Sequence, residues 1–148
     1  MPNFNAGTYF INTEVSKLKI GEVYMMKFEG DGSVQTGWRP GVIVQNNVGN
    51  KHSPNVIALP LTTSLKNIGQ PTHVVIKAYD SGIPRDSMVL CENPSTMCKE
   101  NIGEFITELG EEYMNKIAKS YTLASSVISF LNIEELLGLW KRASALNS

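Results

Sequence analysis

Cysteines, long apolar runs and, in one stretch, acidic residues are scarce in this 148-residue sequence, and each scarcity excludes a class of protein. Two cysteines, Cys91 and Cys98, are too few for a disulfide scaffold, and their spacing does not match that of zinc ligands. No apolar run approaches the ~20 residues of a membrane-spanning helix. Residues 1–5 lack the basic and apolar segments of a secretory signal. We therefore expect a cytoplasmic protein without a membrane span or metal site.

Acidic side chains are missing from one long stretch, because no Asp or Glu lies between Asp31 and Asp80. The formal charge of the whole chain is only −1, so this imbalance is local. The stretch contains four basic residues and both histidines: Arg39, Lys51, Lys66, Lys77, His52 and His73. A surface built from it tolerates a polyanion such as a nucleic acid. Strands are in general poor in acidic residues, which gives a second explanation for the same pattern.

Short strands separated by turns account for most of the chain, and helices are expected only near its end. Residues rich in β-branched and aromatic side chains predict strands at 20–28, 41–45, 55–61, 72–78, 87–91 and 105–109. Apolar residues at three- and four-residue steps between Met114 and Leu131 predict a helix that begins at Glu111. Asn132 and Glu135 resemble a capping box at the start of a second helix.

This order predicts a mainly β (α+β) fold: a small closed or half-closed barrel followed by a helical tail. With 42% hydrophobic and 18% charged residues, the composition is that of one globular domain. The second helix is amphipathic. Its apolar face could pack on the rest of the molecule, widen a dimer or contact a partner protein, and we expect the first of these.

Two segments contain side chains that could bind an anion or take part in a reaction. Residues 32–40 form a polar, glycine-containing loop that delivers Arg39 to the start of a strand, and residues 59–64 end a strand in the hydroxyls of Thr62, Thr63 and Ser64. Neighbouring strands would bring this guanidinium and these hydroxyls together, which makes a phosphate-binding set. The alternative is that Arg39 pairs with a carboxylate and the threonines are ordinary strand residues. Taken alone, the two segments favour that alternative.

Further motifs occur in a fixed order along the chain. They are Gly21–Tyr24 (G-D/E-V-x), the loop Gly32–Pro40, residues 42–50, Ser53–Pro54, Pro60–Thr62, Pro71–Val74 and Arg85–Glu92. The series resembles the MazF/PemK family, the toxin endoribonucleases of type II toxin–antitoxin systems, over roughly residues 19–128. The resemblance implies an N-terminal arm at 1–18, an SH3-like barrel of the MazF/PemK/CcdB type with short helices at 19–128, and an extra helix at 129–148.

The resemblance also implies an activity. Members of the family form homodimers and cut single-stranded RNA, chiefly mRNA, at short specific sequences, without a metal or other cofactor. The 2′-hydroxyl of the substrate attacks the adjacent phosphate and leaves a 2′,3′-cyclic phosphate and a 5′-hydroxyl. A cognate antitoxin protein inhibits them. The catalytic arginine of the family falls on Arg39 and its catalytic Ser/Thr on Thr62, with Thr63 as the fallback.

Positions that the family uses along its RNA groove match seven further residues of the chain: Ser33, Gln35, Thr36, Thr63, Ser87, Glu92 and Asn93. Val34 replaces a common Glu, which bears on the cleavage sequence more than on the reaction. His52 and His73 match no catalytic position, and we interpret both as surface or turn residues. Two alternatives remain: a non-enzymatic, CcdB-like gyrase-poisoning toxin or binding module on the same barrel, and a hydrolase that uses Cys91 with His73.

Overall fold

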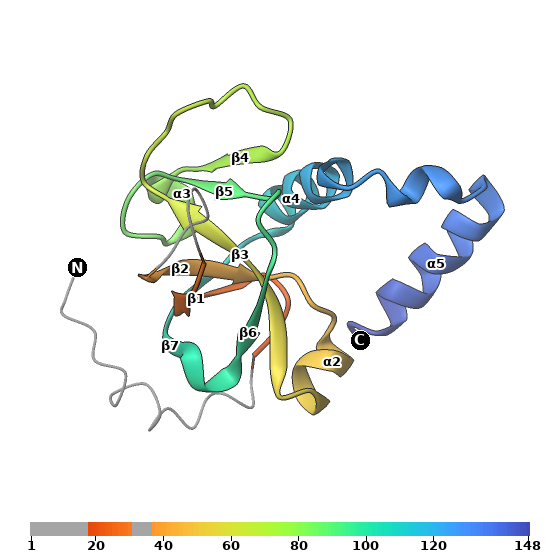
Figure 1. Cartoon of the computed structure of the whole chain (residues 1–148), viewed down its shortest axis with the longest axis horizontal. Coiled ribbons are helices and arrows are strands. Elements are labelled where there is room, and N and C mark those ends of the chain that lie inside the picture. Colours follow the sequence, from red (N-terminus) through yellow and green to blue (C-terminus); the bar gives the residue numbers. More distant parts are fainter. Residues whose placement is uncertain (1–17, 31–36) are drawn as a thin grey trace.

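A computed structural model describes residues 18–30 and 37–148 of the chain. Most of the expected N-terminal arm, and the predicted RNA contacts Ser33, Gln35 and Thr36, lie outside the described residues. The described chain contains seven strands in the order β1 (Glu22–Phe28), β2 (Gly37–Ile43), β3 (Asn55–Thr62), β4 (His73–Ile76), β5 (Ser87–Leu90), β6 (Ser95–Cys98) and β7 (Ile102–Glu108). Figure 1 shows these strands at the centre of the molecule.

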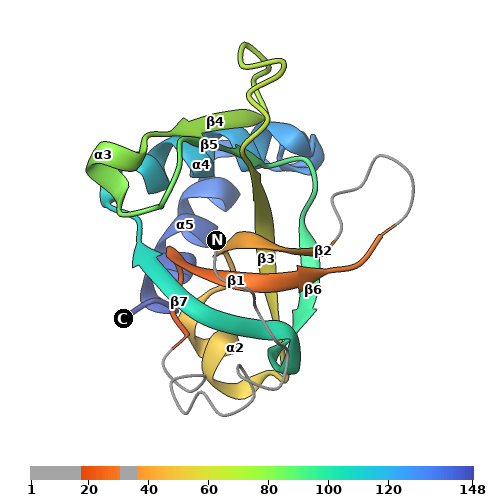
Figure 2. The ribbon, with the colours of Figure 1, turned by 90° about the vertical axis from the view of Figure 1, so that its left-hand side faces the viewer.

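The seven strands form one antiparallel sheet in the order β4-β5-β3-β2-β1-β7, with β6 also paired to β3. Strand β3 joins the two parts of the sheet, because its first half pairs with β6 and its last residues, Leu61 and Thr62, pair with β5. The predicted mainly β fold is confirmed. The sheet curls strongly (Figure 2), but among the described strands its two ends, β4 and β7, do not pair, so the expected barrel is open.

The helices connect and cover the strands. They are α2 (Asn47–His52), α3 (Ala78–Ser81), the 3₁₀ turn η2 (Lys99–Asn101), α4 (Glu111–Ala124), the 3₁₀ turn η3 (Val127–Phe130) and α5 (Ile133–Ala145). Helix α4 lies against β4 and buries Ile117. None of the described helices is both long and apolar enough to cross a membrane.

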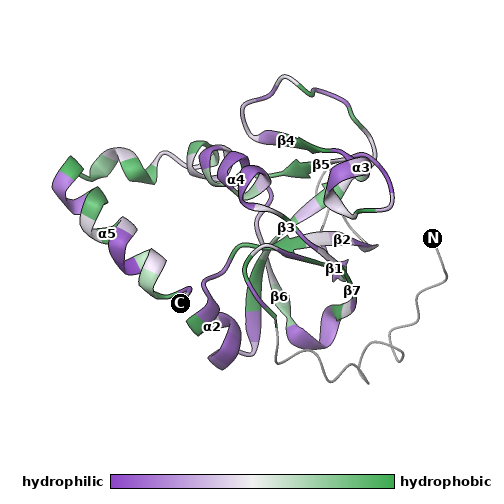
Figure 3. Ribbon diagram, turned by 180° about the vertical axis from the view of Figure 1, so that it is seen from behind, coloured by the Kyte–Doolittle hydropathy of each residue, from purple (hydrophilic) through white to green (hydrophobic). Residues whose placement is uncertain are grey.

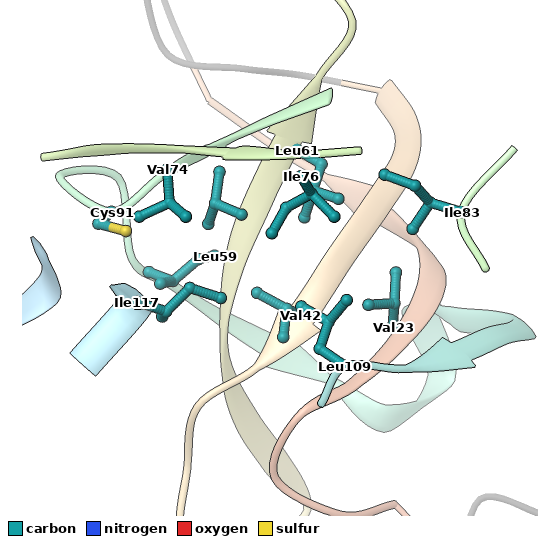
Figure 4. Packing of buried hydrophobic residues seen from close by; sticks show 11 residues of the cluster. Val23, Val42, Leu59, Leu61, Val74, Ile76, Ile83, Cys91, Leu109 and Ile117 are labelled. Atoms are coloured by element: carbon teal, nitrogen blue, oxygen red, sulfur yellow. The ribbon is translucent and has the colours of Figure 1, made fainter. Parts of the chain in front are cut away.

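Both faces of the central sheet are buried, which explains the continuous apolar run of β1. Val23 belongs to one hydrophobic cluster and the next residue, Tyr24, to the other, because successive side chains of a strand point to opposite faces. Figure 4 shows the first cluster, in which side chains from β1 to β5 meet Ile117 of α4. The second cluster gathers side chains of β1, β2, β3 and β6 with Leu18 and with Ile102 of β7. These two clusters hold the sheet in its curled form.

Two positions of β2, Gly37 and Gly41, require glycine for different reasons. Gly37 has a φ of +84°, in the left-handed region that favours glycine. A Cβ on Gly41 would meet the ring of Phe28 at 2.7 Å and the sulfur of Met26 at 2.8 Å, so β1 side chains lie directly across this position. The close packing of β1 on β2 fixes the backbone that carries Arg39.

Local structure differs from the prediction at several places. Strand β2 begins at Gly37, so Arg39 lies in a strand and not in the predicted loop, and helix α3 was not predicted. Residues 46–54, expected to be a turn, contain α2, whose first turn is capped by Asn46 through a 2.9 Å bond from the Gly49 amide to its side chain. Strand β6 has only two apolar residues, Met97 and Cys98, and was not predicted. The helix that begins at Glu111 ends at Ala124, and residues expected to extend it form η3 instead. A side-chain cap decides helix α2 and pairing with β3 decides strand β6.

Helix α5 confirms the predicted capping box, since the side chains of Asn132 and Glu135 each accept from the backbone amide of the other residue. The expectation that its apolar face packs on the body is wrong. Every residue of α5 is exposed, including Trp140 at 65%. The end of the chain returns to α2, where the Val48 amide donates to the Leu146 carbonyl at 3.3 Å.

Candidate active site

Strands β2 and β3 carry the two residues predicted to be catalytic. Gly41 pairs with Pro60 and Val42 with Leu59. Continuing this antiparallel register by one two-residue step puts Arg39 opposite Thr62, on the same face of the sheet. The prediction that neighbouring strands bring the guanidinium and the hydroxyl to one edge therefore agrees with the strand order.

Arg39 and Thr62 line one hollow of about 400 Å³, here called the Arg39 cavity. Its described lining comprises two cations, four hydroxyls and five apolar side chains: Arg39, Arg85, Thr62, Thr63, Ser64, Ser87, Trp38, Pro40, Leu61, Ile83 and Pro84. No carboxylate is among these residues. The acid-free stretch of the sequence thus supplies one wall of a cavity with the donors that a phosphate needs.

Arg39 is half-buried, and burial lowers the pKa of its guanidinium below its usual value. An arginine remains protonated at physiological pH despite such a shift. The same reduced contact with water strengthens its attraction for an anion. The geometry therefore presents a fixed positive charge to the cavity.

The Thr62 hydroxyl oxygen accepts a hydrogen bond from the Ser64 amide at 3.1 Å. This bond orients the side chain but uses an acceptor position of the oxygen, so the hydroxyl proton is left to donate to another group. Ser87 differs, because its hydroxyl donates to the Arg85 carbonyl at 2.8 Å and the residue is 4% exposed. Of the predicted hydroxyl contacts in this cavity, Thr62 and the exposed Thr63 are the accessible ones.

A second hollow of about 430 Å³, here called the His73 cavity, adjoins the first at Thr62 and Ser64. Its lining consists of Thr62, Ser64, Lys66, His73, Met88, Leu90, Glu92 and Asn93. The predicted RNA contacts Glu92 and Asn93 therefore lie on the far side of Thr62 from Arg85. The last residues of β3 separate the two hollows.

His73, which the sequence offered as a functional residue only in the hydrolase alternative, lines the second hollow. Its side chain is only 8% exposed, which corrects the interpretation as a surface residue. Nδ1 lies 2.9 Å from the Asn67 carbonyl oxygen, so this nitrogen donates, and Nε2 lies 2.7 Å from Oε2 of Glu92. With both nitrogens occupied, His73 holds the loop after β3 and the residue after β5 together, rather than facing the cavity as a free base.

The pKa of His73 is raised above 6.5. Burial by itself lowers it, but the hydrogen bonds to Glu92 and to Asn67, together with the charge of Glu92, outweigh that effect. The protonated imidazolium can donate to both oxygens at once, which is why this pair favours the charged form. The pairing of β4 with β5, with His73 opposite Leu90, brings the two side chains together.

The sequence of residues 19–123 matches the model of the family described as PemK-like, MazF-like toxin of type II toxin–antitoxin system. The chain belongs to the PemK/MazF toxin family. The endoribonuclease EndoA of Bacillus subtilis (strain 168) is 35% identical over 114 residues, which cover 76% of this chain and 98% of that protein. The endoribonuclease MazF of Staphylococcus epidermidis is 33% identical over 114 residues, covering 76% and 95%. A solved mycobacterial endoribonuclease in complex with its cognate antitoxin is 29% identical, with a TM-score of 0.61, covering 74% of this chain and 95% of that one.

These PemK/MazF relatives match almost over their whole length, whereas a quarter of this chain lies outside the match. The family match ends within α4, so η3 and α5 follow it. The Arg39 cavity and the His73 cavity both lie within the matched residues.

Cys91 does not fit the alternative of a thiol hydrolase. It is buried, and burial, followed by the charge of Glu92, raises the pKa of its thiol to about 12. A nucleophilic cysteine needs a lowered pKa. Both cysteines are free thiols, and no group of three or more potential ligands among the described residues could hold a metal ion.

Proposed function

We propose that this chain is a toxin endoribonuclease that cleaves single-stranded RNA at short specific sequences by attack of the substrate's own 2′-hydroxyl. The observation that carries the proposal is that Arg39 of β2 and Thr62 of β3 line one cavity, whose described lining contains no carboxylate. The endoribonuclease names of the relatives support the same reaction. They do not favour the alternative of a non-enzymatic toxin on this fold.

In this reaction a bond forms between the 2′-oxygen and phosphorus, and the bond from phosphorus to the 5′-oxygen breaks. The products are a 2′,3′-cyclic phosphate and a 5′-hydroxyl, so the 2′-hydroxyl loses a proton and the leaving oxygen gains one. Negative charge builds on the non-bridging oxygens in the transition state. Arg39 and the Thr62 hydroxyl donate to these oxygens, and a preorganised donor of this kind contributes about 3–4 kcal/mol.

Arg39 acts through its charge, because a guanidinium that stays protonated is a poor base and a poor acid. Water takes the proton of the 2′-hydroxyl and supplies the proton that the leaving 5′-oxygen gains. The reaction needs no metal, since the cation and the hydroxyl supply the charge stabilisation. Cleavage of mRNA places the protein in the cytoplasm.

RNA bases next to the cleaved bond are read in the His73 cavity and by the loop before β2. Unstacked bases expose their edges to hydrogen bonds, for which Glu92 accepts and the Asn93 amide both accepts and donates. Ser33, Gln35 and Thr36 of the loop complete the set of predicted contacts. Arg85, which lines the Arg39 cavity, and Lys66, which lines the His73 cavity, attract the neighbouring phosphates.

The partners that we propose are RNA, a second copy of the chain in a homodimer, and a cognate antitoxin. A solved relative bound to its own antitoxin supports the last of these. An antitoxin segment that lies over the two hollows would block both the reacting phosphate and the bases beside it.

Incubation of the purified chain with a long RNA in EDTA tests the reaction. We expect discrete cuts with cyclic-phosphate and 5′-hydroxyl ends, which are lost in Arg39→Ala. Lys51→Ala is the matched control, because it removes an exposed cation of α2 outside both hollows. RNA that stays intact across many sequences, or a combined Arg39→Ala and Thr62→Val variant that cuts at full speed, would contradict the proposal.

A further inference from the structure

Helix α5 and the η3 turn before it expose a row of large apolar side chains. Phe130 is 88% exposed, Ile133 82%, Leu137 53% and Trp140 65%. Figure 3 shows the hydrophobic colouring along both elements. Soluble proteins seldom leave a contiguous apolar surface of this kind uncovered unless another surface docks on it.

Helix α5 is held to the body at its far end and not along its length. The capping box stabilises its first turn from within, and the bond from the Val48 amide to the Leu146 carbonyl ties the far end to α2. Figure 1 shows the helix standing apart from the sheet and approaching the rest of the chain at α2. A helix of only 13 residues is marginal without packing of its apolar face. Its stability therefore requires a surface that covers this face.

The charges of α5 are arranged in a way that selects the covering surface. At 3.6 residues per turn, Ile133, Leu137 and Trp140 fall within one stripe about 60° wide. Glu134 in the first turn and Lys141 near the end lie beside this stripe on the same flank, about 20° apart around the helix. One end of this flank is therefore negative and the other positive.

We propose that α5 packs antiparallel against α5 of a second copy of this chain, across a two-fold axis. A two-fold contact joins the same surface of both copies, so apolar stripe meets apolar stripe. In an antiparallel pair, equivalent flanks face each other with their ends reversed. Glu134 then meets Lys141 of the partner subunit, and the symmetry repeats this pair. The same helix thus supplies complementary shape and charge to its own copy.

This contact lies outside the family match, which ends at residue 123. It is independent of RNA cleavage, because α5 contributes no residue to the Arg39 cavity or the His73 cavity. Cross-linking and cleavage can therefore fail or succeed separately.

Cysteine cross-linking of the full chain tests the geometry. We use a Cys98→Ser background, which removes the half-buried thiol and leaves the buried Cys91. Leu137→Cys puts a thiol on the stripe, and mild oxidation should give a disulfide-linked pair of chains, because only closely approaching Cβ atoms can be bridged. Gly138→Cys, one residue on and therefore 100° further round the helix on its polar side, is the matched control and should cross-link several-fold less.

A charge swap tests the orientation, with the yield of the Leu137→Cys cross-link as the readout. Glu134→Lys or Lys141→Glu alone turns attraction into repulsion and should lower the yield about threefold to tenfold. The two changes combined in one chain should restore it. Residues 134 and 141 are seven positions apart and do not touch within one helix. The combined variant also places its charges unfavourably for the helix dipole. Recovery of the cross-linking yield therefore requires a contact between two helices.

Failure of the combined variant to recover, or equal cross-linking from Leu137→Cys and Gly138→Cys, would overturn the antiparallel contact. So would a thiol at position 137 that forms no disulfide and reacts with an alkylating agent as fast as an unfolded peptide does. That last outcome would leave the apolar stripe to a different protein, such as the antitoxin.

Discussion

The two hollows on either side of Thr62 differ in what their side chains can do. The Arg39 cavity has two guanidinium groups and no carboxylate among its described lining, so it stabilises negative charge. The His73 cavity combines a carboxylate, an amide and a lysine, which can distinguish one base edge from another. A shared β3 end keeps the two a fixed distance apart. The comparison suggests that rate depends on the first hollow and sequence selection on the second.

Removal of the guanidinium should give the largest effect. Arg39→Ala is expected to lower kcat by about 10²–10³, the typical cost of losing one preorganised donor. Single-turnover cleavage of a short RNA containing the preferred sequence measures this loss. Arg85→Ala, in the same cavity, should raise KM more than it lowers kcat. Equal losses of kcat in both variants would mean that Arg39 and Arg85 contribute equally to catalysis.

Removal of the Thr62 hydroxyl should have a smaller effect. Thr62→Val keeps the shape and should lower kcat about 10- to 100-fold, because a neutral hydroxyl contributes less than a guanidinium. Thr62→Ser retains the hydroxyl and should recover most of the rate in the same assay. If Thr62→Val and Thr62→Ser behaved alike, the methyl group rather than the hydroxyl would be the important feature.

Changes in the His73 cavity should alter selection instead of rate. Asn93→Ala removes the amide that we propose reads a base edge, and it should reduce the preference at one RNA position about tenfold. Sequencing of the 5′-hydroxyl ends from a mixed RNA pool measures the preference. A uniform fall in cleavage at all sites, with unchanged preference, would assign Asn93 to structure alone.

The His73–Glu92 pair gives the smallest expected effect, a pH-dependent stability. Because the folded-state pKa of His73 is raised above its ordinary value of 6.5, the pair stabilises the fold fully below that value. The contribution is lost as the pH rises through the folded-state pKa. Urea unfolding of wild type and His73→Gln should therefore differ more at pH 6 than at pH 9. A difference that is the same at both pH values would show that the imidazole charge is not involved.

Much of the fold could be predicted because its signals are local. The apolar run of β1 and the capping box of α5 depend on residues within one element, and both appear in the structure. Helix α2 was missed because its first turn is held by a single Asn46 cap in a segment rich in asparagine and glycine. Strand β6 was missed because pairing with β3 decides it, and its own four residues carry little hydrophobic signal.

The candidate site likewise has residues that the sequence could predict and residues that it could not. Arg39 and Thr62 follow from motifs in the sequence, and the strand order then puts them in one cavity. His73 matched no motif of the reaction, and its contact with Glu92 spans 19 residues and two strands. A residue whose role comes from a partner on another strand has no signature of its own in the sequence.

By itself, the sequence determined the mainly β class, the family and the two residues expected to bind the reacting phosphate, because strand propensity and motif spacing are properties of short segments. Tertiary structure alone decided that the sheet stays open, that His73 is clamped to Glu92, and that α5 keeps its apolar stripe exposed. Each of these depends on which distant parts of the chain come into contact. Burial of apolar surface contributes free energy only when that contact forms, so no short segment of sequence can indicate it.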